Sequence, residues 1–329
     1  MKEQLPGGAQ RKLEYLRISV TDRCNLRCAY CLPQEGLPLV PREEILTYEE
    51  IALVARAAAR AGVRHVRLTG GEPLVRPDLV RLVEQLAAIP GLQDLSLTTN
   101  GVLLGPLAPQ LAAAGLRRVN VSLDSLRPER FRAITRGGEL ALALAGLEAA
   151  RRAGLEPVKV NVVVMRGVND DEILDFAARA RTDGWHVRFI ELMPIGAAAG
   201  QAERWFIPNE LLKTRVESAY GPLEPVALEG AGPARTYRLP GGSGSIGFIS
   251  PLSEHFCSSC NRLRLTARGQ LLPCLASPKG LELLPLLRRG ASDDELVQML
   301  QLAFALKGDG HHLAARSGGL LWPMSAVGG

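Results

Sequence analysis

Residues 21–33, TDRCNLRCAYCLP, place three cysteines within eight positions: Cys24, Cys28 and Cys31. No fourth cysteine lies nearby, whereas a zinc ion or a fully protein-bound iron–sulfur cluster takes four ligands. The spacing Cys-x3-Cys-x2-Cys therefore favours a [4Fe–4S] cluster in which one iron stays open to a small chelating molecule. A zinc ion completed by a histidine is the alternative. The one early histidine, His65, falls on a predicted strand.

A second group of three cysteines lies toward the other end of the chain: Cys257, Cys260 and Cys274. His255 precedes this group by two residues and offers a further ligand for zinc. Tightly grouped cysteines in a cytosolic chain indicate metal binding rather than disulfides. We interpret the second group as the ligands of an auxiliary [4Fe–4S] cluster, again with one open iron, which is available to a substrate.

The composition predicts a globular protein with a large core. Of its 329 residues, 47% are hydrophobic and 22% are charged. The first residues lack the apolar stretch of a secretory signal, and no run approaches the ~18 apolar residues of a membrane span. These features predict a cytoplasmic protein that does not bind a membrane. The formal net charge of +5 fits a phosphate-bearing ligand, a nucleic acid or no particular partner.

From residue 16 onward, short β-branched runs alternate with Ala- and Leu-rich segments, which predicts a parallel sheet with right-handed crossovers. The six predicted strands span residues 16–20, 66–69, 95–99, 118–123, 158–165 and 186–192. The first predicted helix has Thr47 as its N-cap, Glu50 three residues on, and Gly62 at its end. Six such units fit either a doubly wound sheet or an incomplete barrel.

Unusual residues follow the predicted strands. The cysteine loop comes after the first, GGEP (70–73) after the second, TNG (99–101) after the third, and Asp-Ser (124–125) after the fourth. In both candidate folds ligands gather at the carboxyl ends of the strands, so these motifs predict one binding face. The alternating pattern stops near residue 194. We therefore expect a domain of residues 1–194 and a smaller α+β region of residues 195–329 that carries the second cysteine group.

Three basic residues stand out within extended segments. Arg262 and Arg264 alternate after Cys260, so their side chains point the same way, beside the second cysteine group. Guanidinium groups suit phosphate because each donates two hydrogen bonds to its oxygens. Lys159 lies on a predicted buried strand, where a charge is costly unless it is paired. The alternatives are a solvated edge for the arginines and a position at the strand start that leaves the lysine ammonium in water.

The first cysteine motif, with Tyr30 directly before Cys31, resembles that of the radical S-adenosylmethionine (SAM) enzymes. Further stretches resemble the GTP 3′,8-cyclase (MoaA) family of molybdenum-cofactor biosynthesis, among them VRLTGGEPL, LTTNG, VNVSLDS, FIELMP, CSSCNRLRLT and the terminal GG. The resemblance covers nearly the whole chain and implies a lyase with an incomplete (β/α)6 barrel, whose mouth the C-terminal region closes. It also implies the reaction. A 5′-deoxyadenosyl radical from the reductive cleavage of SAM removes the 3′ hydrogen of GTP, and C3′ then bonds to guanine C8.

The same resemblance implies roles for individual residues. The two cysteine groups hold two [4Fe–4S] clusters, and SAM contacts Tyr30, Gly71, Ser122 and Met193. GTP lies near Arg17, Arg67, Thr98, Lys159, Arg262, Leu263 and Arg264, with its guanine at the open iron of the second cluster. Arg17 and the terminal residues Gly328 and Gly329 assist catalysis.

The implied partners are GTP, an electron donor of the flavodoxin or ferredoxin type, and the cyclic pyranopterin monophosphate synthase that takes over the product. A homodimer is compatible with this reading, and no nucleic acid is expected. The segment KGDGHH departs from the Lys-Pro-x-x-His pattern of the family, which leaves the roles of Lys307, His311 and His312 open. Two alternatives are another radical SAM enzyme with an auxiliary cluster, such as a peptide maturase, and a non-enzymatic zinc or iron–sulfur protein that binds RNA.

Overall fold

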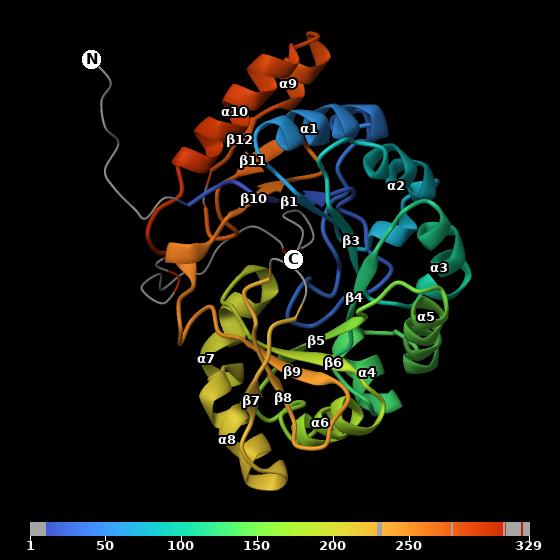
Figure 1. Ribbon diagram of the computed structural model, residues 1–329, viewed down its shortest axis with the longest axis vertical. Helices are drawn as coiled ribbons and strands as arrows, with labels where there is room; N and C mark the ends of the chain where they lie inside the picture. The colour runs from blue at the N-terminus through green and yellow to red at the C-terminus, as the bar shows by residue number, and fades with distance from the viewer. Residues whose placement is uncertain (1–10, 229–231, 278, 312, 314–323, 325–329) are drawn as a thin grey trace.

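The computed structural model describes residues 11–228, 232–277, 279–311, 313 and 324. Its strands form one sheet that curves around the centre of the molecule, and the helices lie on the outside of the curve (Figure 1). The strands are β1 (Tyr15–Ser19), β2 (His65–Thr69), β3 (Asp94–Thr99), β4 (Arg118–Ser122), β5 (Lys159–Val164), β6 (His186–Glu191), β7 (Glu224–Pro225), β8 (Arg235–Arg238), β9 (Ser245–Ile249), β10 (Arg262–Leu265), β11 (Gln270–Leu272) and β12 (Leu281–Glu282). The α-helices are α1 (Tyr48–Arg60), α2 (Leu79–Ala87), α3 (Leu104–Ala113), α4 (Pro128–Thr135), α5 (Leu140–Arg152), α6 (Ile173–Thr182), α7 (Ala202–Trp205), α8 (Asn209–Tyr220), α9 (Leu284–Arg288) and α10 (Asp293–Ala305).

The middle of the sheet is a parallel array in the order β10-β1-β2-β3-β4-β5-β6-β9, flanked by antiparallel strands at both ends. Strands β1 to β6 are the six predicted strands, and the predicted incomplete barrel is confirmed. Among the described residues no pairing joins the outermost strands β12 and β7, so the barrel is open. The sequence did not predict that β9 and β10 extend the array, because both pair with strands far away along the chain.

Local sequence signals set the helix boundaries. The Thr47 hydroxyl accepts a hydrogen bond from the Glu50 N–H, and the Glu50 carboxylate accepts from the Thr47 N–H, which is the predicted capping box of α1. Gly62, with a φ of 110°, ends the helix as expected. Ser292 and Glu295 form the same capping box on α10. Within the described part of the chain, no helix is both long and apolar enough to cross a lipid bilayer.

The two faces of the parallel array differ in polarity. Leu16 and Ile18 of β1 belong to the main hydrophobic core and are fully buried. Alternate residues line the inside of the curve, where Arg264, Arg17 and Arg67 lie in register on neighbouring strands. Interiors of closed barrels are usually filled by branched apolar side chains. A polar interior therefore indicates space for a ligand.

The first prediction concerns Gly146, which allows α5 to pack on the TNG turn. A Cβ at Gly146 would lie 2.2 Å from the carbonyl oxygen of Gly101, so Gly146→Ala forces the helix away from the turn. We expect this change to lower the free energy of unfolding by about 1–3 kcal/mol, measured by urea denaturation of the apoprotein. At Gly105 of α3 a Cβ would meet nothing within 4 Å, so Gly105→Ala is the matched control, expected to stabilise by up to about 1 kcal/mol. Equal effects of the two substitutions would contradict the packing argument.

Candidate active site

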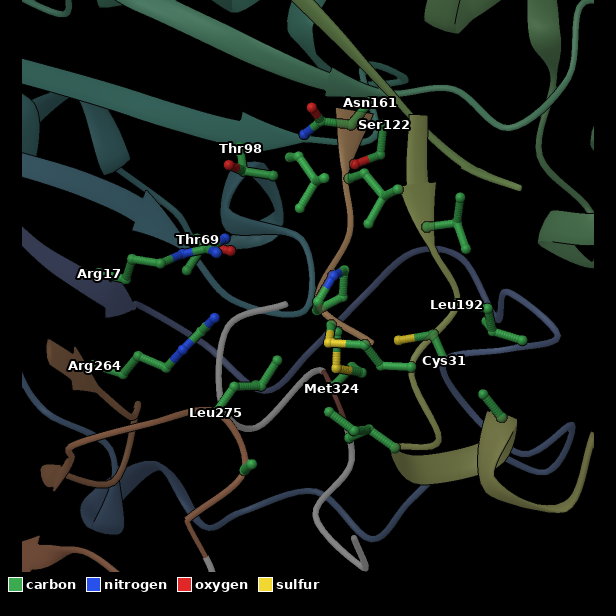
Figure 2. Close-up of a pocket in the computed structure, with 18 of the residues that line it drawn as sticks. Arg17, Cys31, Thr69, Thr98, Ser122, Asn161, Leu192, Arg264, Leu275 and Met324 are labelled. Carbon is green, nitrogen blue, oxygen red and sulfur yellow. The ribbon is translucent and has the colours of Figure 1, made fainter. Parts of the chain in front are cut away.

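A cavity of about 440 Å³ extends along the inside of the curved sheet, from the carboxyl ends of the parallel strands to the start of β10. It brings together both cysteine groups and most of the predicted site residues: Cys24, Cys28, Cys31, Cys257, Cys260, Cys274, Arg17, Tyr30, Arg67, Gly71, Thr98, Ser122, Met193, Arg262 and Arg264. Figure 2 shows Arg17, Arg264 and Thr98 pointing into the same space from neighbouring parts of the sheet. The residues predicted at the strand ends therefore share one cavity with the second cysteine group, which lies beside the start of β10.

The GGEP turn holds the start of the cysteine loop through the backbone. The Gly71 N–H donates to the carbonyl of Thr21, and the Glu72 N–H donates to the carbonyl of Arg23, both at 2.8 Å. A Cβ at Gly71 would lie 2.3 Å from the Arg23 carbonyl oxygen, so only glycine permits this approach. The motif thus positions the loop that carries the first three cysteines.

The Glu72 side chain ties the GGEP turn to the TNG turn. Its carboxylate accepts hydrogen bonds from the Thr99 hydroxyl and the Asn100 N–H, both at 2.7 Å, and from the Leu74 N–H at 3.1 Å. Burial raises the pKa of Glu72 to about 7, although these donors act in the opposite direction. The buried carboxylate therefore links the turn after β2 to the turn after β3.

A second polar network fixes Tyr30, the residue before the last cysteine of the loop. The Tyr30 hydroxyl donates to Asp124 at 2.8 Å, and the Val163 N–H donates to the other oxygen of Asp124 at the same distance. Asn169 donates to the carbonyls of Asp124 and Val163. Burial raises the pKa of Asp124 to about 6. The cysteine loop is thereby anchored to the ends of β4 and β5.

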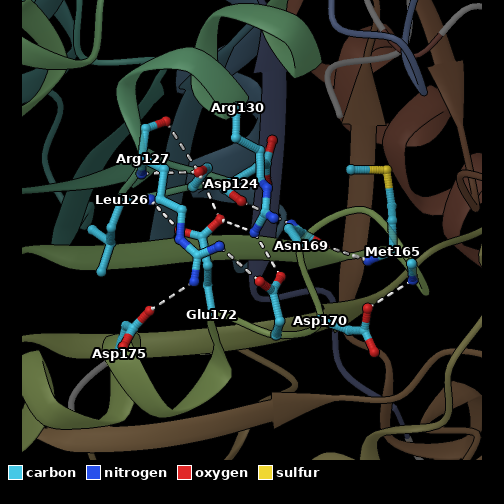
Figure 3. Close-up of polar contacts among 12 residues, drawn as sticks. Asp124, Leu126, Arg127, Arg130, Met165, Asn169, Asp170, Glu172 and Asp175 are labelled. Carbon is cyan, nitrogen blue, oxygen red and sulfur yellow. Dashed lines mark hydrogen bonds and ion pairs between the residues drawn. The ribbon is translucent and has the colours of Figure 1, made fainter.

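Glu172 extends this network away from the cavity. Its buried carboxylate accepts hydrogen bonds from the Ser125 hydroxyl, the Leu126 N–H and the Arg130 guanidinium (Figure 3). Because Ser125 directly follows Asp124, the turn that holds Tyr30 is itself held on its outer side. The sequence indicated the turn at Asp124 and Ser125. It did not predict that the carboxylates of Asp124 and Glu172 accept the hydrogen bonds that hold this turn.

Positive side chains of neighbouring strands face the cavity. Burial is the main cause that lowers the pKa of Arg17, and repulsion from Arg264 and Arg67 adds to it. Burial likewise lowers the pKa of Arg188 to about 9, with repulsion from Arg67 as the next cause. Since arginine stays protonated in proteins, these shifts express a strongly positive interior. Such a site attracts an anion, and a polyphosphate most strongly.

The carboxylates that line the cavity do not neutralise these cations. Glu72 and Asp124 accept from the donors described above. Glu191 accepts from the backbone N–H groups of Asn209, Leu252 and Ser253, at distances of 3.0–3.1 Å. Each carboxylate thus secures a loop.

Three buried polar atoms on the cavity wall have no hydrogen-bond partner among the described residues: Thr98 Oγ1, Asn161 Oδ1 and Arg188 Nε. Buried polar groups are nearly always paired, so these atoms fit a bound molecule that supplies donors and acceptors. Thr98 was predicted as a site residue, whereas Asn161 and Arg188 were missed. The signal that could have found them is their alternation with apolar residues on strands expected to be apolar throughout.

Two predicted residues do not line the cavity. Lys159 is 1% exposed at the start of β5, so the alternative in which its ammonium reaches water is wrong. Burial, followed by repulsion from Arg188 and Arg118, lowers the pKa of Lys159 to about 6. The Leu263 side chain is fully buried in the main core, so any contact with a ligand has to use its backbone. The predicted residues Gly328, Gly329 and His312 lie outside the described residues.

The second cysteine group surrounds β10. Cys257 begins a short 3-10 helix (Cys257–Ser259), Cys260 directly follows it, and Cys274 comes after β11. The Arg262 and Arg264 side chains line the same cavity, as their alternation predicted, so the solvated-edge alternative is wrong. The pKa of Cys260 falls to about 7, because Arg262 and Lys307 favour the thiolate more strongly than burial opposes it.

Both cysteine groups offer soft sulfur ligands, which fit an iron–sulfur cluster.

Histidines do gather around Cys257, since the ligand atoms of His255, Cys257 and His311 lie within 4.8 Å of one another. However, His311 Nδ1 accepts a hydrogen bond from the Leu313 N–H at 3.1 Å, so Nε2 carries the proton and donates to the Pro251 carbonyl. A histidine with both nitrogens engaged has no lone pair left for a metal. His311 is therefore not available as a zinc ligand in this arrangement.

Comparisons with known proteins agree with this site. The Radical SAM superfamily matches residues 18–180, and the family described as Molybdenum Cofactor Synthesis C matches residues 185–313. The GTP 3′,8-cyclase of Moorella thermoacetica is 55% identical over 92% of this chain and 94% of its own. That of Thermodesulfovibrio yellowstonii is 48% identical over 97% and 98% of the two chains. The chain belongs to the GTP 3′,8-cyclase family.

The family expected from the sequence motifs is thus confirmed. Among solved structures, Streptococcus suis SuiB bound to S-adenosylmethionine is similar, with a TM-score of 0.57 and 15% identity over 81% of this chain and 61% of that chain. At this identity the likeness concerns the fold alone, an α/β arrangement with parallel strands.

The second prediction concerns Glu72. Because its folded-state pKa of about 7 lies above the ordinary value, the folded chain binds this proton more tightly than the unfolded chain. Its contribution to stability is full at low pH and is lost as the pH rises through about 7. We expect Glu72→Gln to remove about 3 kcal/mol of pH dependence in the free energy of unfolding between about pH 4 and pH 8. Urea denaturation of the apoprotein across this range measures it. Glu84→Gln, at an exposed position of α2, is the control, and an unchanged slope in Glu72→Gln would contradict the assignment.

Proposed function

We propose that this chain is a GTP 3′,8-cyclase of molybdenum-cofactor biosynthesis, which joins ribose C3′ of GTP to C8 of its guanine. Membership of the family supports this activity. The observation that carries it is the single cavity that unites two groups of three cysteines with a wall of arginines. When bound, SAM and its [4Fe–4S] cluster supply the one-electron chemistry that removes the hydrogen from C3′.

At one side of the cavity the chain binds and orients SAM. We assign Cys24, Cys28 and Cys31 to the first cluster, and the SAM contacts to Tyr30, Gly71, Ser122 and Met193. The hydrogen bond between Tyr30 and Asp124, and the close approach of Gly71 to Arg23, support this assignment because they make the cysteine loop rigid.

At the other side the chain holds GTP. We assign the triphosphate and ribose contacts to Arg17, Arg67, Thr98, Lys159, Arg262, Leu263 and Arg264, and we add Asn161 and Arg188. The positive interior and the unpartnered atoms of Thr98, Asn161 and Arg188 support this assignment. Lys159 lies behind the cavity wall, and a bound polyphosphate would favour the protonated form of its amine.

The second cysteine group, Cys257, Cys260 and Cys274, holds the second [4Fe–4S] cluster and places the guanine. Arg17 and the tail residues Gly328 and Gly329 assist catalysis, and the enclosed cavity keeps water away from the reacting ribose. We keep residues 1–194 and 195–329 as functional divisions, one for SAM and one for the purine. The alternatives of a peptide maturase and an RNA-binding protein are not favoured by the family.

The proposal extends to the setting of the reaction. The electron comes from a flavodoxin- or ferredoxin-type donor, and the product passes to the cyclic pyranopterin monophosphate synthase. We also propose that the protein forms a homodimer and is located in the cytoplasm.

The third prediction separates the two halves of the cavity. We expect Arg262→Ala or Arg264→Ala to weaken GTP binding about tenfold or more, since each removes charged hydrogen bonds to phosphate. Reductive cleavage of SAM continues in both variants. Equilibrium binding of GTP and formation of 5′-deoxyadenosine measure the two effects. Arg268→Ala is the control, because the Arg268 guanidinium is exposed and paired with Glu44. Loss of SAM cleavage with intact GTP affinity would contradict the assignment.

The fourth prediction concerns the metal content. Anaerobically reconstituted protein is expected to hold about eight irons per chain, and replacing either cysteine group by serines should leave about four. Iron and sulfide quantification measures this, and mass spectrometry of the product should show an isomer of GTP. Zinc at either group, or a cluster fully ligated by side chains, would contradict the proposed chemistry.

A further inference from the structure

Lys307, just after α10, lies between the two segments that carry Cys260 and Cys274. Its ammonium donates hydrogen bonds to the carbonyl of Arg262, at 2.8 Å, and to the carbonyl of Pro273. Arg262 stands two residues after Cys260, and Pro273 directly precedes Cys274. One positive group therefore bridges both of these ligand-carrying segments.

The third cysteine of the group is joined to the same turn by Arg11. The Arg11 guanidinium donates to the carbonyl of Cys257 at 2.9 Å, and to the carbonyls of Lys307 and Gly308, each at 3.2 Å. The Arg11 side chain is only 13% exposed, so water competes weakly for these contacts. The backbone at all three cysteines is thus linked through Arg11 and Lys307, which come from opposite ends of the chain.

Besides these carbonyls, the Lys307 ammonium lies near the cysteine side chains. Among the described residues no carboxylate lies within ion-pair distance of its ammonium, although the side chain is half-buried. Burial lowers the pKa of Lys307, and attraction to Cys260 and Cys274, with a hydrogen bond to Cys260, acts in the opposite direction. A buried charge is costly unless an opposite charge stands by, so Lys307 and the thiolates stabilise each other.

We propose that Lys307 is a positioning residue for the metal site of Cys257, Cys260 and Cys274. Its two hydrogen bonds fix the separation of the ligand segments before the metal binds, and its charge offsets that of the thiolates. The inference rests on the proposed function only in taking this site to hold a [4Fe–4S] cluster. It gives a role to a residue that the sequence motifs left open.

The test isolates the second site in a full-length chain whose first group, Cys24, Cys28 and Cys31, is replaced by serines. In this background Lys307→Met keeps the length of the side chain and removes its charge and its donors. We expect iron at the second site to be lost to a chelator about tenfold faster, as is typical when a residue that supports metal ligands is removed. The reduction potential of the cluster, followed by electron paramagnetic resonance, should shift to more negative values.

Three further variants make the result decisive. Lys307→Arg retains a positive donor and should restore most of the iron retention and the potential. Lys213→Met, at an i,i+4 ion pair on α8, is the control and should match the parent chain. Arg11→Gln, which keeps a donor but weakens the link to Cys257, should lower iron retention with less effect on the potential.

Iron retention and potential are read without GTP turnover, so they do not depend on the cyclase activity. If the chain failed to cyclise GTP but Lys307→Met lost iron as described, the proposed function alone would fall. Unchanged retention and potential in Lys307→Met would overturn the inference. So would a loss of iron that Lys307→Arg does not rescue and that matches a lower unfolding temperature of the apoprotein, since this would show a folding role alone.

Discussion

The structure has to accommodate like charges that are buried inside an open barrel. Arg264, Arg17 and Arg67 stand side by side on neighbouring strands and repel one another, and desolvation adds to the cost. Such an arrangement persists only if the surrounding fold is stable without it. The apolar outer face of the same strands, packed under the helices, provides that stability. The interior is therefore prepared for a polyanion before the ligand arrives, which reduces the reorganisation needed on binding.

Acidic residues play a different part from the one that charge pairing would suggest. Glu72, Asp124 and Glu191 lie on the cavity wall, yet they accept hydrogen bonds from backbone, hydroxyl and phenol donors. A carboxylate placed against Arg17 or Arg188 would have stabilised the empty protein and competed with a phosphate. By securing the strand-end loops instead, these groups make the cysteine loop rigid and keep the positive potential available.

The sequence predicted what short-range signals encode. The cysteine spacing, the capping box at Thr47 and the ends of β1 to β6 all depend on residues close together in the chain. Asn161 and Arg188 were missed because the register between neighbouring strands places them together on the cavity wall. The sequence of a single strand does not reveal that register. The added strands β9 and β10, and the bridge from Lys307, join segments that lie 34 or more residues apart, so no local pattern predicts them.

These long-range pairings explain how two cysteine groups come to face one cavity. Strand β9 extends the array beyond β6, and β10 extends it beyond β1, so the segment after residue 194 is fixed at both ends of the barrel. The chain between β9 and β10 must therefore cross the open side, and it carries Cys257 and Cys260. The loop after β1 carries the first group, and β1 itself pairs directly with β10. The separation of the two groups is thus set by the register of two paired strands, a rigid connection suited to a reaction between two bound molecules.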